Sequence, residues 1–316
     1  MNRFIAIVVC SIMASVYCTA QQIEQFTQPT FSHFLFNPAA AGKGSTPEFV
    51  FKYRTQWVGA FDGEEPTTQI LSFDTRFQNK FKNLGIGAII FNDVTGPSNR
   101  LGIELAYSYK LKLGESGGKL ALGFSGFLLN YSINTNELIL SDPDDPALFD
   151  PGNNKINADA NAGIYFYDKN YYVGLSTAQL FQNKFIFNPN DTVGFVQLAR
   201  HYYFIAGYVY DLSDKMEFEP SVLVKGIQAS PIQYDLNARL IYDKNYWLGI
   251  NFRPGESVAG YLGFIYDDRW KIGYSYDYTT SSLSAVSNGS HEIMLGFELL
   301  KKKTQKTPDK DGVIIP

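Results

Sequence analysis

The stretch Leu101–Leu113, LGIELAYSYKLKL, decides the fold because apolar and polar residues alternate along all of it. Every odd-numbered residue in it is Leu, Ile or Tyr, and every residue between is small, polar or charged. Successive side chains of a β-strand point to opposite faces, so this segment makes one apolar face and one polar face. Tyrosines on the apolar face are typical of a strand that faces lipid and ends near the membrane surface. The stretch therefore predicts a strand of a transmembrane β-barrel.

The same alternation recurs from residue 48 to residue 299. The expected strands cover residues 48–57, 67–77, 84–92, 100–113, 119–133, 157–167, 171–180, 201–212, 216–226, 233–242, 246–253, 258–266, 270–279 and 291–299. Most have the roughly 9–11 residues that a tilted strand needs to cross a bilayer. We therefore expect an all-β fold, a transmembrane antiparallel β-barrel of about 14 strands over residues 48–299. An even number of strands is the rule for bacterial single-chain barrels.

The connections between these strands are expected to alternate in length. Turns after the even-numbered strands are short and polar, whereas those after the odd-numbered strands are mostly longer, notably 134–156, 181–200 and 281–290. Outer-membrane barrels have short periplasmic turns and longer external loops. A repeat, YDKNYYVG at Tyr167–Gly174 and YDKNYWLG at Tyr242–Gly249, spans two of the short turns. It predicts hairpins with Tyr167, Tyr171, Tyr242 and Tyr246 at the periplasmic interface.

The first 20 residues have the pattern of a secretory signal peptide. Arg3 supplies the positive charge, residues 4–16 are apolar, and Cys18-Thr19-Ala20 precedes Gln21. Both cysteines lie in this segment, so the mature chain is expected to have no disulfide. A mean hydropathy of -0.14 and the lack of a second long apolar run argue against helical membrane spans. The net charge of -4 argues against a nucleic-acid partner.

Two segments flank the expected barrel. Residues 21–47 contain Phe26, Phe31, Phe34 and Phe36, which make them too apolar for a free tail. We expect this segment to pack on or in the barrel, as a short helix or a plug. Residues 300–316 are charged and show no alternation, so we expect a flexible periplasmic tail.

The polar faces of the strands carry charges that need water or partners in the lumen. They include Glu104, Lys110, Asp235, Arg239 and Arg253. Pairing of these charges with one another is favoured over a track for a charged substrate.

No catalytic or cofactor motif stands out. The three histidines are far apart in the sequence, and Ser290-His291 is the one local candidate for a hydrolase pair. Asp142, Asp144, Asp145 and Asp150 lie in one expected external loop and have oxygen ligands suited to Ca²⁺, but not the EF-hand spacing. A solvated acidic loop is favoured. We expect a protein that is not an enzyme and has no cofactor, no catalytic residue and no metal site.

Three motifs in order along the chain carry a family resemblance. They are Asn37-Pro38-Ala39 with Gly42, then Tyr53-Arg54-Thr55-Gln56-Trp57, then Asp142-Pro143-Asp144-Asp145-Pro146. In these motifs and in its strand pattern, the mature chain resembles the PorP/SprF family of Bacteroidetes outer-membrane proteins. The signature residues, to which the resemblance assigns no role, are Asn37, Pro38, Gly42, Tyr53, Arg54, Gln56, Trp57, Asp142, Asp144 and Asp145.

The resemblance implies a place in the type IX secretion and gliding-motility system. It implies an integral outer-membrane protein, exported through a cleaved signal peptide and surrounded by outer-membrane lipid. Its partners would be proteins of the secretion machinery or a secreted surface adhesin, docked or anchored by the external loops 134–156 and 181–200 or by the periplasmic turns and tail. The alternative is a porin-like transporter that passes a small or apolar solute past its N-terminal segment.

Overall fold

The computed structural model describes residues 25–44, 46–77, 81–114, 117–134, 154–186, 195–228 and 230–299. The expected signal peptide (1–20) and the expected tail (300–316) lie outside the described residues. Within them, short helical turns precede a long series of strands. The elements are η1 (Pro29–Phe31), α2 (His33–Phe36), η2 (Pro38–Ala40), β1 (Glu48–Thr55), β2 (Thr67–Arg76), β3 (Leu84–Thr95), β4 (Ser98–Leu113), β5 (Gly118–Ile133), β6 (Asn154–Tyr167), β7 (Tyr171–Ala178), β8 (Lys184–Ile186), β9 (Phe195–Gln197), β10 (His201–Tyr208), β11 (Tyr210–Ser213), β12 (Met216–Ile227), β13 (Gln233–Tyr242), β14 (Tyr246–Arg253), β15 (Ser257–Tyr266), β16 (Trp270–Thr279), η6 (Ser282–Ala285) and β17 (Ser290–Glu298).

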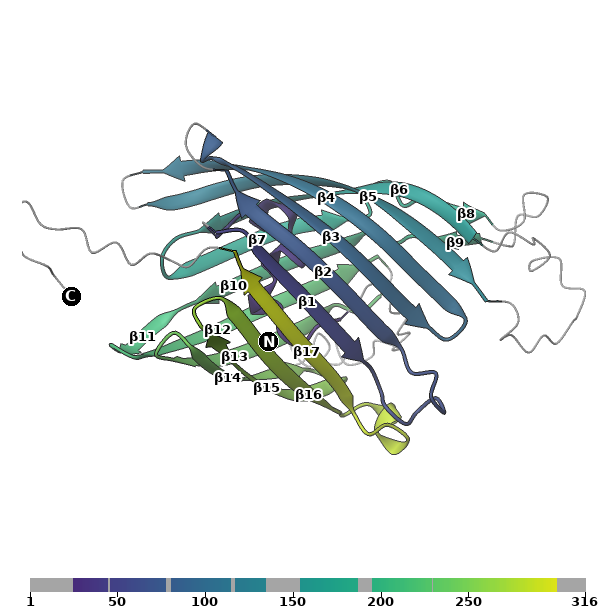
Figure 1. The fold of residues 1–316 in the computed structure, drawn as a ribbon. Coiled ribbons are helices and arrows are strands. Elements are labelled where there is room, and N and C mark those ends of the chain that lie inside the picture. Colours follow the sequence, from purple (N-terminus) through teal and green to yellow (C-terminus); the bar gives the residue numbers. More distant parts are fainter. Residues whose placement is uncertain are drawn as a thin grey trace, which may run out of the picture.

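The strands close into a barrel (Figure 1). Each is antiparallel to its neighbours, β1 pairs with β17, and pairing of β10 with β12 closes the ring. The main sheet has 15 strand segments, but β10 and β11 are consecutive parts of one strand that both pair with β12, so the barrel has 14 strands. The predicted fold and strand count are confirmed.

The alternation read from the sequence separates the two faces of the wall. On β4, Leu105 is 64% exposed on the outer face, whereas Ser108 is fully buried on the inner face. The outer faces of the other strands are likewise mostly Leu, Ile, Val, Phe and Tyr. Hydrocarbon can solvate these side chains, and the backbone groups are paired around the closed ring, which is what a membrane-spanning sheet requires.

The two rims of the barrel differ. We call the rim with the turns at 168–170, 214–215, 243–245 and 267–269 the short-turn end, and the opposite rim the long-loop end. Short turns face the periplasm in outer-membrane barrels. Tyr171, Tyr242 and Tyr246 are exposed near the short-turn end, where interfacial rings are expected. The prediction for Tyr167 is wrong: it is buried, because its register opposite Lys119 and Tyr172 directs its ring into the lumen.

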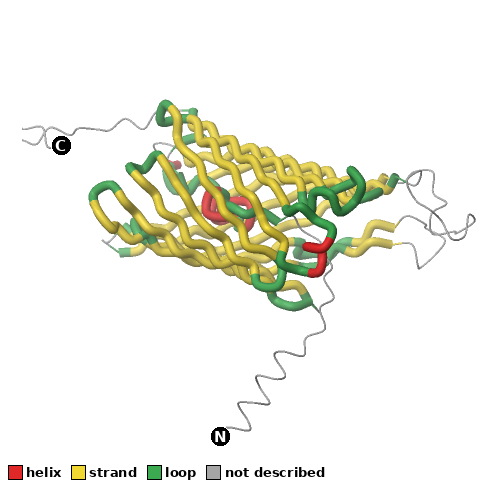
Figure 2. Tube along the Cα trace, turned by 90° about the horizontal axis from the view of Figure 1, so that it is seen from below, coloured by secondary structure: helices red, strands yellow, loops and turns green. Residues whose placement is uncertain are grey.

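The core of the protein lies inside the barrel. Its largest cluster of buried apolar side chains joins residues 26–41 to the inner faces of the strands. Figure 2 shows these helical turns enclosed by the strands. None of the described helices is long and apolar enough to cross a membrane.

A small hairpin, β8–β9, stands at the long-loop end beyond β6 (Figure 1). Phe185 on β8 is fully buried against Phe127 and Leu129 of β5, and Asn157 Nδ2 on β6 donates to the Lys184 carbonyl at 2.7 Å. The expected external loop 181–200 therefore folds back onto the barrel in its described parts. Residues 135–153 of the other long loop lie outside the described residues.

Candidate functional site

The lumen is occupied by residues 25–44, which we call the N-terminal plug. Pro29 and Pro38 begin η1 and η2, because proline has no N–H to satisfy and its φ is already helical. Asn37 ends α2 and caps η2, with its Oδ1 accepting from the Ala39 N–H at 2.9 Å. The plug is thus a compact chain of three short turns rather than one helix.

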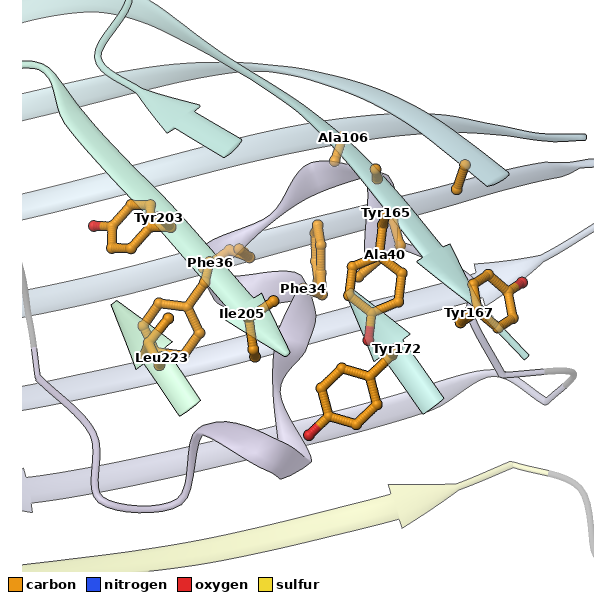
Figure 3. Packing of buried hydrophobic residues seen from close by; sticks show 14 of the residues in the cluster. Phe34, Phe36, Ala40, Ala106, Tyr165, Tyr167, Tyr172, Tyr203, Ile205 and Leu223 are labelled. Atoms are coloured by element: carbon orange, nitrogen blue, oxygen red, sulfur yellow. The ribbon is translucent and has the colours of Figure 1, made fainter. Parts of the chain in front are cut away.

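Apolar packing holds the middle of the plug. Phe34 and Phe36 are buried among side chains that point inward from the barrel wall, including Tyr203 and Ile205 of β10 and Leu223 of β12 (Figure 3). Full burial of one such ring contributes about 2 kcal/mol. The hydrophobic effect therefore fastens the plug to several strands at once.

Glycines on the inner wall make room for the plug backbone. A Cβ on Gly123 would lie 2.1 Å from Ala39 N, and one on Gly163 would lie 2.1 Å from Asn37 Oδ1. The close approach lets Asn37 Nδ2 donate to the carbonyls of Ile164 and Leu175, at 2.9 and 3.2 Å. Asn37 therefore joins the plug to β6 and β7.

The plug leaves the lumen near the short-turn end. The Ala41 carbonyl accepts from Ser108 Oγ and Lys110 Nζ, both at 2.7 Å. Gly42 then turns the chain with φ +63° and donates to Asp74 Oδ2 at 2.7 Å. A side chain at residue 42 would meet both a left-handed backbone and the Thr75 carbonyl, 2.5 Å from the Cβ position, so only glycine fits without strain.

A buried polar contact also holds the plug near this end. His33 Nδ1 lies 2.6 Å from the Tyr165 hydroxyl and 3.2 Å from Lys43 Nζ. Burial, with a smaller contribution from the Lys43 charge, lowers the pKa of His33 well below its ordinary value. The neutral ring has one acceptor nitrogen, which can accept from the Tyr165 hydroxyl, while Lys43 Nζ donates to that hydroxyl at 3.3 Å.

At its other end the plug enters a cluster of buried charges. Arg54 of β1 donates from Nη1 to Thr27 Oγ1 at 2.8 Å and from Nη2 to Asp277 Oδ2 at 2.9 Å, and its Nη1 lies 3.5 Å from Glu292 Oε2. Lys52 Nζ lies 3.6 Å from Glu292 Oε1 and donates to the Gln28 carbonyl at 2.9 Å. Two cations and two anions thus balance each other around the plug.

A second set of charges continues this cluster toward the long-loop end. Arg253 pairs with Asp235, whose other oxygen lies 2.9 Å from Lys225 Nζ. Arg253 Nη1 also donates to Gln25 Oε1 at 2.9 Å and to Glu256 Oε1 at 3.0 Å. Both ends of the plug are therefore held by the barrel wall.

The predicted pairing among the lumen charges holds only in part. Asp235 and Arg253 pair with each other, Arg239 pairs with Glu219 on β12, and Lys110 binds the plug carbonyl. Glu104 makes no ion pair with any described residue.

The signature residues separate into three places. Asn37, Pro38, Gly42, Arg54 and Gln56 are in or against the plug, and all five are nine-tenths or more buried. Tyr53 is on the outer face of β1, half-buried, and Trp57 lies past its end with φ +54° and its ring 6.3 Å from that of Phe61. Asp142, Asp144 and Asp145 lie outside the described residues.

The sequence analysis did not identify Thr27, Glu292 or the role of Asp277, because no local spacing relates positions that are 223 to 265 residues apart.

Of the two remaining candidate sites, the Ser290-His291 pair lies within the described residues, and the acidic loop from Asp142 to Asp150 lies outside them. Ser290 Oγ accepts from Trp57 N at 3.1 Å, while His291 Nδ1 lies 2.7 Å from the Tyr274 hydroxyl. Across the described ranges, no three His, Cys, Asp or Glu side chains gather as ligands for a metal ion.

Comparison with known proteins gave one family and several similar folds. Residues 18–297 match the sequence model of the family described as type IX secretion system membrane protein PorP/SprF. Similar solved structures include the CymD monoaromatic hydrocarbon channel, with 11% identity, 89% of this chain and 94% of that chain covered, and a TM-score of 0.49. The Acinetobacter baumannii outer membrane protein Omp33 is similar with 9% identity, 81% of this chain and 99% of that chain covered, and a TM-score of 0.45. A Pseudomonas aeruginosa FadL homologue is also similar (9% identity, 87% and 94% covered, TM-score 0.43). No curated protein matches the chain.

Proposed function

Because the chain belongs to the PorP/SprF family of type IX secretion system membrane proteins, we propose that it is a non-enzymatic barrel that docks proteins. Its role would be to hold the secretion machinery, or to anchor a secreted surface protein, at the outer membrane. The observation that carries this proposal, beside family membership, is the filled lumen. The barrel wall is joined to the plug by apolar packing and by hydrogen bonds from buried charged side chains, so the rims are the surfaces left for docking a protein.

The long-loop end is the better candidate for the docking surface. The β8–β9 hairpin gives this rim a folded projection, with Phe185 buried beneath it. Phe181 and Ile186, beside and on the hairpin, are 67% and 51% exposed. Exposed apolar side chains beyond the wall of a barrel are typical of protein contacts.

The second candidate function is transport of a small or apolar solute past the plug. A cavity between the plug and the wall favours it. The plug itself counts against it, because its buried polar contacts must break before a continuous path opens. Conductance that stays low in the wild-type barrel would support docking over transport.

The experiment is a mild-detergent pull-down of the tagged, full-length protein from native outer membranes, followed by mass spectrometry. We expect secretion-system proteins or a large secreted surface protein to co-purify. Replacing residues 181–200, or separately residues 134–156, by short Gly-Ser linkers should remove that partner while the barrel still assembles. The matched control is Lys244→Glu in a turn at the short-turn end, which should keep the partner. Retention of the partner by both loop variants would refute the long-loop assignment, and a barrel isolated without any partner would refute docking.

A further inference from the structure

A cavity of about 90 Å³ lies in the lumen beside the N-terminal plug. Its floor is formed by plug residues 34–38, and its walls come from the inner faces of β2 to β7 and β10. Thr177 and Gln179, at the end of β7, place it in the half of the lumen nearer the long-loop end. Phe127 and Leu129 of its wall also carry the β8–β9 hairpin. The cavity thus lies between the plug and the folded external hairpin.

The walls are mostly apolar and rich in aromatic rings. Phe34 and Phe36 of the plug line this space together with Phe91, Phe127 and Leu129 of the wall. A concave apolar site with a few polar groups is the usual form of a small-molecule site. The rings also offer negatively polarised faces to a cation.

Some of the polar groups in the lining have oxygens without a partner. Gln179 is only 6% exposed, yet its Oε1 has no hydrogen-bond partner, and the same is true of Thr177 Oγ1. Glu104 lies beside Ser125 and Asn161 and has no cation paired with it among the described residues. Arg100, the cation in the lining, is held by Asp93, with Nη2 2.6 Å from Oδ2. The cavity therefore offers oxygen acceptors and a carboxyl group with no cation paired to it among the described residues.

We propose that this cavity binds a small molecule with an aromatic or short aliphatic body and a primary amine. The body fills the space among the phenylalanines, and the amine donates to Glu104 and to the orphaned oxygen of Gln179. A charge-assisted hydrogen bond is the strongest contact available to such a ligand. This binding site is independent of the docking function, which needs only the rims.

The test uses the full-length protein in lipid nanodiscs, because a detergent tail would compete for an apolar cavity. Benzylamine is the probe, benzoate is its anionic counterpart, and binding is measured by isothermal titration calorimetry. We expect benzylamine to bind saturably at one site and benzoate not to bind. Glu104→Gln keeps the shape of the side chain and should weaken benzylamine about tenfold, the loss of one charge-assisted hydrogen bond.

The control is Glu64→Gln in the exposed β1–β2 connection, which should leave the affinity unchanged. Gln179→Asn tests the second contact and replaces Glu104→Gln should that variant fail to insert; asparagine tolerates the φ of +59° at this position. It should also weaken benzylamine severalfold. Failure of benzylamine to saturate, equal binding of benzoate, or equal affinity of the cavity variant and Glu64→Gln would each overturn the proposal.

Discussion

Replacing Arg54 by methionine should destabilise the barrel far more than a surface substitution does. Arg54 is 1% exposed and contacts Thr27, Asp277 and Glu292 through its guanidinium. Methionine keeps an unbranched apolar stem but supplies neither the charge nor the donors. The variant leaves Asp277 and Glu292 opposite Lys52 alone, so the cluster acquires one uncompensated negative charge.

The size of the expected loss in the free energy of unfolding follows from the burial of the Arg54 ion pairs. Removing one partner of a buried ion pair costs about 3–5 kcal/mol, because the remaining charge stays desolvated. At 1.4 kcal/mol per tenfold, the unfolding equilibrium should shift by roughly a hundredfold to several thousandfold. Thr27 also loses the donor to its Oγ1, so the start of the plug should loosen along with the wall.

Urea unfolding in micelles, followed by the fluorescence of the three tryptophans, measures the loss. Lys169→Met, in an exposed short turn, is the matched control and should change stability by less than about 0.5 kcal/mol. Adding Asp277→Asn to Arg54→Met should cost less than the sum of the two single substitutions, because the pair is removed together. A loss for Arg54→Met no larger than that for Lys169→Met would refute the assignment of Arg54 to a buried, plug-holding ion network.

Three further predictions test the plug. Gly123→Ala should lower the free energy of unfolding in urea by about 1–3 kcal/mol, because the new Cβ would lie 2.1 Å from Ala39 N. Gly126→Ala, on the outer face of the same strand, should leave the stability unchanged. Equal effects of the two substitutions would contradict the close approach of the plug to Gly123. Tyr165→Phe removes the hydroxyl 2.6 Å from His33 Nδ1 and should cost about 1 kcal/mol in the same assay, so a neutral result would mean that this contact adds nothing to stability. Deleting residues 25–41 should raise single-channel conductance in planar bilayers, and an unchanged conductance would show that the plug does not close the lumen.

The barrel was predictable because its signal is local. Alternation along Leu101–Leu113 needs only neighbouring residues, and a closed antiparallel sheet is the structure that can place one such face in lipid. The same reasoning placed Lys110, Asp235 and Arg253 on the polar, lumen-facing sides of their strands. It misplaced Tyr167, because the repeat shared by two turns does not specify which face each tyrosine takes; the register opposite Lys119 does.

The contacts of the plug inside the barrel could not be predicted from the sequence and are seen only in the tertiary structure. Composition showed that residues 21–47 are too apolar to stay free, but not which strands they contact. Thr27 meets Asp277 only because closure of the ring brings residues 250 positions apart to the same side of the lumen. The space that Gly123 leaves for Ala39 and the cavity beside Glu104 likewise depend on how several strands are placed around the lumen. Strand periodicity is a property of the chain, whereas the shape of the lumen depends on register and closure, which no short segment encodes.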